Sequence, residues 1–168
     1  MGKSRRTGAA AAGFSLIELM FVVAIVGIIA MVAIPAYTKQ IQKNNRAVAK
    51  ARLAQASQLL ERFYSDNNNY YVDVVSGNLS GSTGASTPAG FAMLMRVPSG
   101  TTVYSGSNNE STSVYTVTLS TPTANSFTLT ATPVPGTTQV NDTKCMNLTL
   151  TNAGVKGISG SGSLSDCW

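Results

Sequence analysis

The pattern of apolar and charged positions begins with a long uncharged stretch. From Leu19 to Thr38 there are twenty residues without a charged side chain, and most of them are Leu, Ile, Val, Met, Ala or Phe. At about 1.5 Å per residue, a helix of this length is roughly 30 Å long, which is enough to cross the hydrocarbon core of a bilayer. The pattern therefore predicts an apolar helix suited to a membrane or to an apolar bundle.

Beyond this stretch the pattern becomes amphipathic. Apolar residues recur at steps of three and four, which places them on one helix face: Ala49, Leu53, Ala56, Leu60 and Phe63. Basic residues recur at the same steps on another face: Lys39, Lys43, Arg46 and Lys50. The polar run Asp66–Asn69 is a stop signal. We expect one helical region from Phe14 to about Asn67, with a second half that can lie on a sheet.

From about Tyr70 the chain is rich in Gly, Ser, Thr and Asn and shows strand signals. Apolar and polar residues alternate in the ranges 115–119, 127–131 and 146–150. Thr121–Asn125 has the composition of a turn between the first two runs, and Asn152–Gly154 that of a turn before a short strand near Val155. The sequence predicts an α+β fold, in which an antiparallel sheet of about four strands packs one face on the amphipathic half of the helix.

Two segments before these strands are less defined. Leu79 to Pro88 is low in apolar residues, which favours a loop. Phe91 to Met95 is a short apolar run that fits a helix or a buried strand, and periodicity does not separate the two.

The first thirteen residues form a basic leader. Lys3, Arg5 and Arg6 are its charged residues, and Ala9–Ala12 and Gly13 end it with small side chains. A secretory signal has its small-residue cleavage site after the apolar region, whereas here the small residues precede it. Cleavage at Gly13 would leave the apolar helix on the mature protein. We therefore expect a leader over 1–13, an apolar helix over 14–38 and a globular head over 39–168.

Glu18 is a lone carboxylate at the start of the apolar helix. A carboxylate suits the positive end of a helix dipole, and this alone could explain it. An unpaired charge in an apolar setting is nevertheless costly, which favours a partner supplied by another chain.

The stretch Gly13–Tyr37, GFSLIELMFVVAIVGIIAMVAIPAY, resembles the N-terminus of a type IV pilin. The resemblance implies that prepilin peptidase cuts after Gly13 and methylates the new terminus at Phe14. It also places the family's glutamate at Glu18, and its helix-weakening Gly and Pro at Gly27 and Pro35.

A weaker resemblance concerns the C-terminal part. Residues 128–133, 145–150, Gly154 and the terminal Cys167-Trp168 look like PilE-like minor pilins. The two resemblances imply a structural subunit of a type IV pilus, with roles in pilus assembly, adhesion or twitching motility. A major pilin and a pseudopilin of a type II secretion system are the alternatives, although Asp142 and Asp166 are too sparse for the calcium loop of the major pseudopilin.

The resemblance further implies partners and a location. The partners would be other pilin subunits, prepilin peptidase, the inner-membrane assembly machinery and, before assembly, membrane lipid. The precursor would span the bacterial inner membrane once with its head in the periplasm, and the mature subunit would join an extracellular pilus. The positive-inside rule points the other way, because five bases follow the apolar span between residues 39 and 52 and only three precede it.

Cys145 and Cys167 are the only cysteines. They could be free buried thiols. An exported chain meets an oxidising compartment, however, and this favours a disulfide that closes a loop of about twenty residues, worth about 3 kcal/mol in the chain-entropy model. In pilins, which the chain resembles, such a disulfide bounds an exposed contact loop.

Composition limits the remaining function classes. The net charge is +5, but removing the three leader bases leaves nine bases against seven acids, or +2. There is no His, and no nucleophile elbow, phosphate loop or metal-ligand spacing. We therefore expect no enzymatic activity, cofactor or metal. The basic stripe over 39–50 has no interleaved aromatic residue, so nucleic-acid binding is disfavoured without being excluded.

Overall fold

The computed structural model describes residues 14–81, 84–98, 100–106, 112–120 and 122–168. Its first element is the long helix α1, Leu16–Asn67, which has Pro35 inside it. The chain divides into two compact units, Met1–Lys39 and Gln40–Trp168. The leader, including Gly13, lies outside the described residues.

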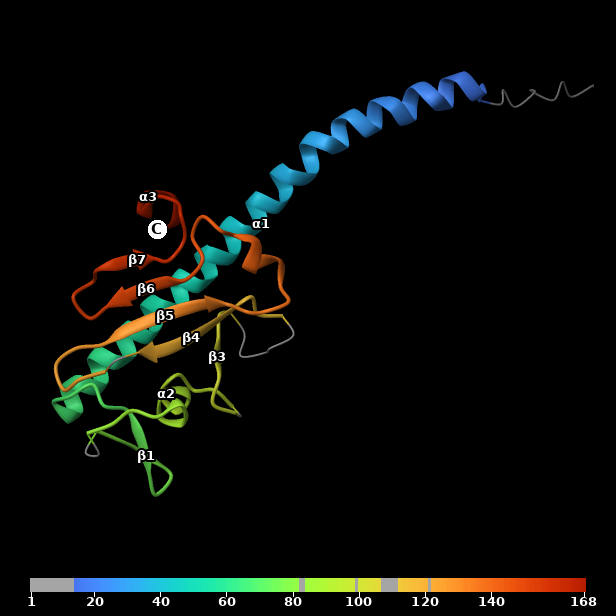
Figure 1. Cartoon of the computed structure of the whole chain (residues 1–168). Helices are drawn as coiled ribbons and strands as arrows, with labels where there is room; N and C mark the ends of the chain where they lie inside the picture. Colours follow the sequence, from blue (N-terminus) through green and yellow to red (C-terminus); the bar gives the residue numbers. More distant parts are fainter. Residues whose placement is uncertain (1–13, 82–83, 99, 107–111, 121) are drawn as a thin grey trace, which may run out of the picture. The chain divides into compact units, whose positions relative to one another are not determined.

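The second unit contains a five-stranded antiparallel sheet in the order β3-β4-β5-β6-β7 (Figure 1). Its strands are β3 Val103–Tyr104, β4 Tyr115–Ser120, β5 Thr128–Pro133, β6 Leu148–Thr151 and β7 Lys156–Ile158. The predicted α+β fold is confirmed, and the four predicted strands correspond to β4 to β7. The fifth strand, β3, has only two residues, which is too short to leave an alternating pattern in the sequence.

The core lies between one face of this sheet and the second half of α1. The buried helix residues are Ala49, Leu53, Ala56, Leu60 and Phe63, as the helical periodicity predicted. They share one cluster with inward side chains of the sheet, including Tyr115, Val117, Leu129 and Leu148. In β5, buried and half-buried residues alternate along the whole strand. This is the pattern of a sheet with one covered face.

A small two-stranded hairpin precedes the main sheet. It pairs β1 Asp73–Val75 with β2 Asn78–Ser80 around Ser76 and Gly77, whose φ angles are 52° and 80°. Two consecutive positive φ values fit a tight hairpin turn, which Gly permits without strain. The expectation of a loop starting at Leu79 was therefore wrong over Leu79 and Ser80, and the Ser-Gly dipeptide was the overlooked signal.

The ambiguous run near Phe91 belongs to a helix, α2, Pro88–Leu94. The side chain of Thr87 accepts a hydrogen bond from the Gly90 amide, and Pro88 occupies the first turn. Both residues favour a helix start. A Cβ on Gly90 would lie 2.4 Å from the Val72 carbonyl oxygen, so glycine allows this helix to pack closely on the chain before β1.

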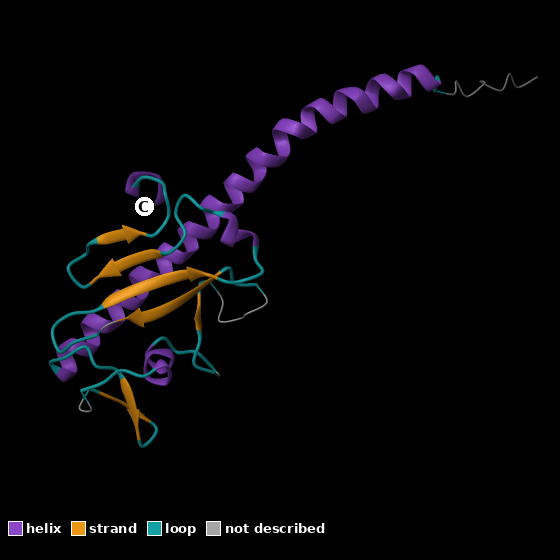
Figure 2. Cartoon of the chain, in the orientation of Figure 1, coloured by secondary structure: helices purple, strands orange, loops and turns teal. Residues whose placement is uncertain are grey.

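Two short helices complete the unit: the 3-10 helix η1, Thr138–Asn141, and α3, Leu164–Cys167 (Figure 2). The segment Pro122–Asn125 connects β4 to β5 as predicted, while Thr121 lies outside the described residues. The turn at Asn152–Gly154 joins β6 to β7, and Gly154 takes a φ of 74° there.

Candidate functional site

The apolar half of α1 is the first candidate surface. By length and composition this helix could cross a membrane, and none of its apolar window is buried within the chain. Large apolar side chains from Phe14 to Ile34 are more than half exposed. So much exposed apolar surface requires a lipid or protein environment.

Glu18 lies in the first turn of α1, and Phe14 precedes the helix in irregular backbone. The Glu18 side chain is exposed, and no ion pair reaches it within residues 14–81 or the other described ranges. The carboxylate of Glu18 follows Phe14 by four positions in the sequence, while its pairing with an amine of another subunit stays a prediction.

Gly27 and Pro35 lie inside the helix, as the resemblance implied. A Cβ on Gly27 would meet nothing within 4 Å, so no contact within the chain requires glycine there. Pro35 has no amide hydrogen, which removes one helical hydrogen bond. Thr38 Oγ1 donates to the Pro35 carbonyl at 3.0 Å. Whether these residues weaken the helix stays a prediction.

The C-terminal disulfide is the second candidate feature. Cys145 and Cys167 are bonded, with an S–S distance of 2.01 Å and a Cα–Cα distance of 5.6 Å, which confirms the predicted pairing. Backbone hydrogen bonds join the segment 159–162 to residues 143–147. A Cβ on Gly160 would lie 2.2 Å from the Lys144 carbonyl oxygen, so glycine is needed for this close approach.

Four basic side chains gather between the second half of α1 and the chain end; we call Lys43, Arg46, Lys50 and Lys156 the basic cluster. Lys50 Nζ donates to the Trp168 carbonyl at 3.3 Å, and Arg46 Nη1 donates to the Asp166 carbonyl at 3.1 Å. Burial, followed by the charges of the other three members, lowers the pKa of Lys50. These positive charges therefore act on one another, and the charge of Arg46 is also paired with the carboxylate of Asp142.

Trp168 adds an aromatic ring to the basic cluster. Its indole Nε1 donates to the Gly157 carbonyl at 3.0 Å, and Lys156 Nζ lies 5.3 Å from the ring centroid. The sequence shows no aromatic residue interleaved with the basic stripe, yet the fold brings one to it from the end of the chain. That argument against nucleic-acid binding is therefore weaker than the sequence suggested.

A buried polar network, which sequence reasoning missed, connects α1 to η1. Gln139 is fully buried; its Oε1 accepts from Asn45 at 3.0 Å, and its Nε2 donates to the Tyr115 hydroxyl at 2.9 Å. The same Nε2 donates to Asp142 Oδ2, which pairs with Arg46 Nε at 3.3 Å. These residues lie up to 97 positions apart, counted from Asn45 to Asp142, so no local pattern could have indicated them.

The described residues offer no group of three or more His, Cys, Asp or Glu side chains that could hold a metal ion.

Two known families match residues 9–149 of the chain between them. The family described as "Type IV minor pilin ComP, DNA uptake sequence receptor" matches residues 35–149. The family described as "Prokaryotic N-terminal methylation motif" matches residues 9–34, which include Gly13, Phe14 and Glu18.

Individual relatives are similar over shorter stretches. The type IV major pilin protein PilA of Myxococcus xanthus is 41% identical over 58 residues, 34% of this chain and 26% of that protein. A fimbrial protein of Neisseria meningitidis is 41% identical over 78 residues, 45% of this chain and 42% of that protein. The wide pilus major component PilA4 of Thermus thermophilus is 42% identical over 60 residues, 36% of this chain and 46% of that protein. The chain thus spans less than half the length of these curated relatives.

Proposed function

The chain belongs to the type IV pilin family, and from this premise we propose that it is a structural subunit of a type IV pilus, in the role of a minor pilin. The observation that carries the proposal is the exposed apolar half of α1, which has Glu18 in its first turn, four positions after Phe14. The match to a minor-pilin family favours that role over a major pilin, while the matched relatives named above are described as major or fimbrial subunits.

The proposed precursor is held in the inner membrane by its apolar helix, with the head in the periplasm. Prepilin peptidase cleaves after Gly13, which creates a positive amine on Phe14 that is then methylated. In the growing filament, the apolar helices of many subunits bundle, and Glu18 of one subunit pairs with the Phe14 amine of its neighbour. An unpaired carboxylate in such a dry bundle would cost several kcal/mol, so this pair favours one axial stagger.

The processing step is tested by mass spectrometry of the membrane and filament forms. We expect a mature chain that begins at methylated Phe14. Replacing Gly13 by a bulky residue should leave full-length precursor in the membrane. A mature terminus beyond the apolar helix would contradict the proposal.

The charge pair is tested with Glu18→Gln and Glu18→Ala in the same cells. Both variants should insert, because removing a charge from an apolar segment lowers the cost of insertion. Both should be cleaved, but their content in sheared filaments should fall. Wild-type filament content would disprove the pairing, and a failure of cleavage would assign Glu18 to peptidase recognition.

The abundance of the chain in pili distinguishes a minor pilin from a major pilin. A minor pilin should form a small fraction of sheared pili, and a deletion strain should still assemble filaments of another subunit. Filaments built almost entirely of this chain would make it a major pilin, and its association with a secretion apparatus alone would favour a pseudopilin.

A second candidate function is DNA binding, as the description of the matching family states for its members. The supporting observation is the basic cluster with Trp168 beside it. Lys and Arg groups attract phosphates with a strong dependence on salt, and an aromatic ring can stack on a base.

DNA binding is tested by fluorescence anisotropy of labelled duplexes with the full chain in detergent, at several salt concentrations. Lys156→Gln should weaken binding and reduce the salt slope by about one. Arg96→Gln, an exposed base outside the cluster, is the matched control. If Lys156→Gln and Arg96→Gln weakened DNA binding equally, the binding would depend on the net charge of the chain and not on the basic cluster.

A further inference from the structure

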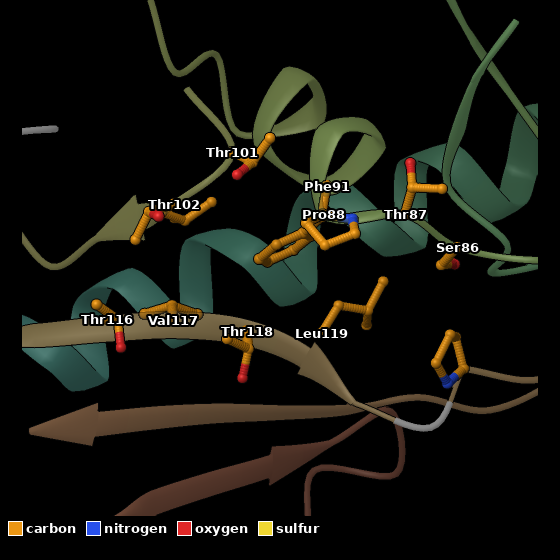
Figure 3. Close-up of a pocket in the computed structure, with 12 residues that line it drawn as sticks. Ser86, Thr87, Pro88, Phe91, Thr101, Thr102, Thr116, Val117, Thr118 and Leu119 are labelled. Atoms are coloured by element: carbon orange, nitrogen blue, oxygen red, sulfur yellow. The ribbon is translucent and has the colours of Figure 1, made fainter. Parts of the chain in front are cut away.

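A groove of about 290 Å³ lies beside the outer edge of β4, facing α2 and the segment before β3 (Figure 3). Its walls carry hydroxyl and apolar side chains, among them Thr87, Phe91, Thr101, Thr102, Val117 and Leu119. None of its lining residues is charged. All its lining residues belong to the second unit, and none of them is a member of the basic cluster.

The edge of β4 at this groove is only partly paired. All six residues of β4 pair with β5, but only Thr116 and Val117 pair with β3 on the other side. The Ser105 amide donates to the Tyr115 carbonyl, so the backbone N–H and C=O groups of Tyr115 point toward the β3 side of β4. Every second residue of a strand points the same way, so the N–H and C=O groups of Val117 and Leu119 also face that side. In the described ranges, no backbone hydrogen bond from that side reaches Leu119.

The opposite wall of the groove is also a backbone segment. Thr101 and Thr102 directly precede β3 in the sequence. If the register that pairs Val103 with Val117 extended to them, Thr101 would lie opposite Leu119. They do not pair: Thr101 and Thr102 are exposed and make no backbone hydrogen bond with the described part of β4. Figure 3 shows Thr101 and Thr102 on one side of the opening and Thr118 and Leu119 on the strand across from them.

The side-chain hydroxyls around the groove are largely engaged within the chain. Thr87 Oγ1 donates to Asp73 Oδ1 at 2.7 Å, Ser86 Oγ accepts from the Val72 amide at 2.8 Å, and Thr118 Oγ1 donates to the Thr130 carbonyl at 3.4 Å. The groups that remain to recognise a ligand are therefore the backbone of Leu119, the apolar floor and the hydroxyls of Thr101 and Thr102 on the opposite wall.

We propose that this groove binds an extended, uncharged peptide segment of a partner protein, which adds to the outer edge of β4 as a strand. Only an extended backbone presents N–H and C=O groups at the spacing of a strand, and strand addition at an open edge is an established mode of peptide recognition. The uncharged walls select against acidic and basic side chains, because these would lose hydration without gaining a partner. Small β-branched side chains fit the floor made by Phe91, Val117 and Leu119. The proposal is independent of filament assembly and of DNA binding.

The test uses the full chain in detergent micelles and a fluorescent peptide of alternating valine and threonine, capped at both ends. We expect saturable binding by fluorescence anisotropy, with new hydrogen-exchange protection of the Leu119 amide. In an extended peptide, odd-numbered and even-numbered residues direct their N–H groups to opposite edges, so two peptides are compared, each N-methylated at one of these two sets. The peptide that loses the N–H groups facing β4 should bind at least about tenfold more weakly, and the other should bind unchanged.

Two variants of the chain complete the test. Thr101→Trp fills the exposed wall of the groove and should abolish peptide binding. Ala153→Trp adds the same bulk at an exposed turn between β6 and β7 and should bind as the unmodified chain does. Circular dichroism of both variants establishes that the head is folded.

Several results would overturn the proposal. If both N-methylation sets bound equally, the backbone would not be the recognition group. If an acidic or basic peptide bound as tightly as the uncharged one, the groove would not select by charge. If the Leu119 amide were protected from hydrogen exchange without peptide, the segment before β3 would already pair with this edge. If that protection increased with protein concentration, a second copy of the chain would cover the edge.

Discussion

Arg46 and Asp142 form an ion pair in the head, and both side chains are largely buried, at 13% and 4% exposure. Removing one partner from such a pair leaves an uncompensated charge, which costs far more than the pair itself contributes. Gln139 donates a second hydrogen bond to the same carboxylate, so Asp142 depends on two residues from different elements.

Arg46→Ala should therefore lower the free energy of unfolding of the head by about 3 kcal/mol. Urea unfolding of the full chain in detergent, followed by the fluorescence of Trp168, measures this change. Arg62→Ala removes an exposed base from the same helix and should change the free energy by less than about 0.5 kcal/mol. A similar effect of the two substitutions would contradict the importance of the buried pair.

Tyr115 links stability to alkaline pH. Burial raises its pKa to about 12, while the hydrogen bond from Gln139 acts in the opposite direction. The unfolded chain loses this proton near pH 10, so the contribution of Tyr115 is fully present below that pH and is lost as the pH rises to about 12. Tyr70 behaves alike, because burial, followed by its hydrogen bond to Glu61, raises its pKa to about 12.

We expect the free energy of unfolding to fall between about pH 10 and 12. The slope of this free energy with pH should correspond to about two protons, because the folded chain keeps the protons of both tyrosines and the unfolded chain has lost them. Tyr115→Phe and Tyr70→Phe should each reduce the slope by about one proton. Denaturant unfolding at a series of pH values measures it. A slope that neither variant changes would mean that other groups control alkaline unfolding.

At the scale of elements, the disulfide fixes the last part of the chain to the start of β6. The bond joins cysteines separated by 22 positions, and the enclosed segment contains β6, β7 and α3. The same segment supplies Lys156 and the carbonyl of Asp166 to the basic cluster. The arrangement of that cluster therefore depends on how well this segment is held.

Replacing both cysteines by serine should lower the free energy of unfolding of the head by about 3 kcal/mol. Hydrogen exchange should increase over 157–167 and stay unchanged over 19–38, because the apolar helix has its own backbone hydrogen bonds. A reductant should destabilise the natural chain and leave the double variant unaffected. If the reductant acted equally on both, the effect would not come from this bond.

At the scale of the whole molecule, the two units have different environments. In the first unit the apolar side chains are exposed, whereas in the second the apolar face of α1 is buried against the sheet. Stability of the head and insertion of the apolar helix should therefore respond to different substitutions.

Leu53→Ala, at a fully buried position, should lower the free energy of unfolding of the head by about 2 to 5 kcal/mol. The fraction of chain in the membrane should stay constant, because Leu53 lies outside the apolar stretch. Gln58→Ala, at an exposed position of the same helix, is the control. Loss of membrane insertion in Leu53→Ala would show that the head and the apolar helix depend on each other.

Much of the fold was predictable because it depends on local periodicity. The buried face of α1 followed from apolar residues three and four positions apart, and β4, β5 and β6 from alternation. The strands of the hairpin β1–β2 have three residues each, which is too short for an alternating pattern, so its local signal was confined to the turn at Ser76 and Gly77. Strand β3 has two residues, and its pairing with the distant strand β4 defines it. Helix α2 had its signal in Thr87 and Pro88, which cap a run that was otherwise ambiguous.

The candidate sites divide in the same way. The sequence alone showed the order of Gly13, Phe14, Glu18 and the apolar stretch, since these features are neighbours along the chain. It favoured a disulfide between Cys145 and Cys167, the only two cysteines, and the structure decided between this bond and two free thiols. Only the tertiary structure decided that Trp168 meets Lys156, that Gln139 joins Asn45 to Asp142, and that β4 keeps an open edge beside Thr101. Each of these contacts depends on how distant segments pack, because burial and backbone pairing arise when the chain closes on itself.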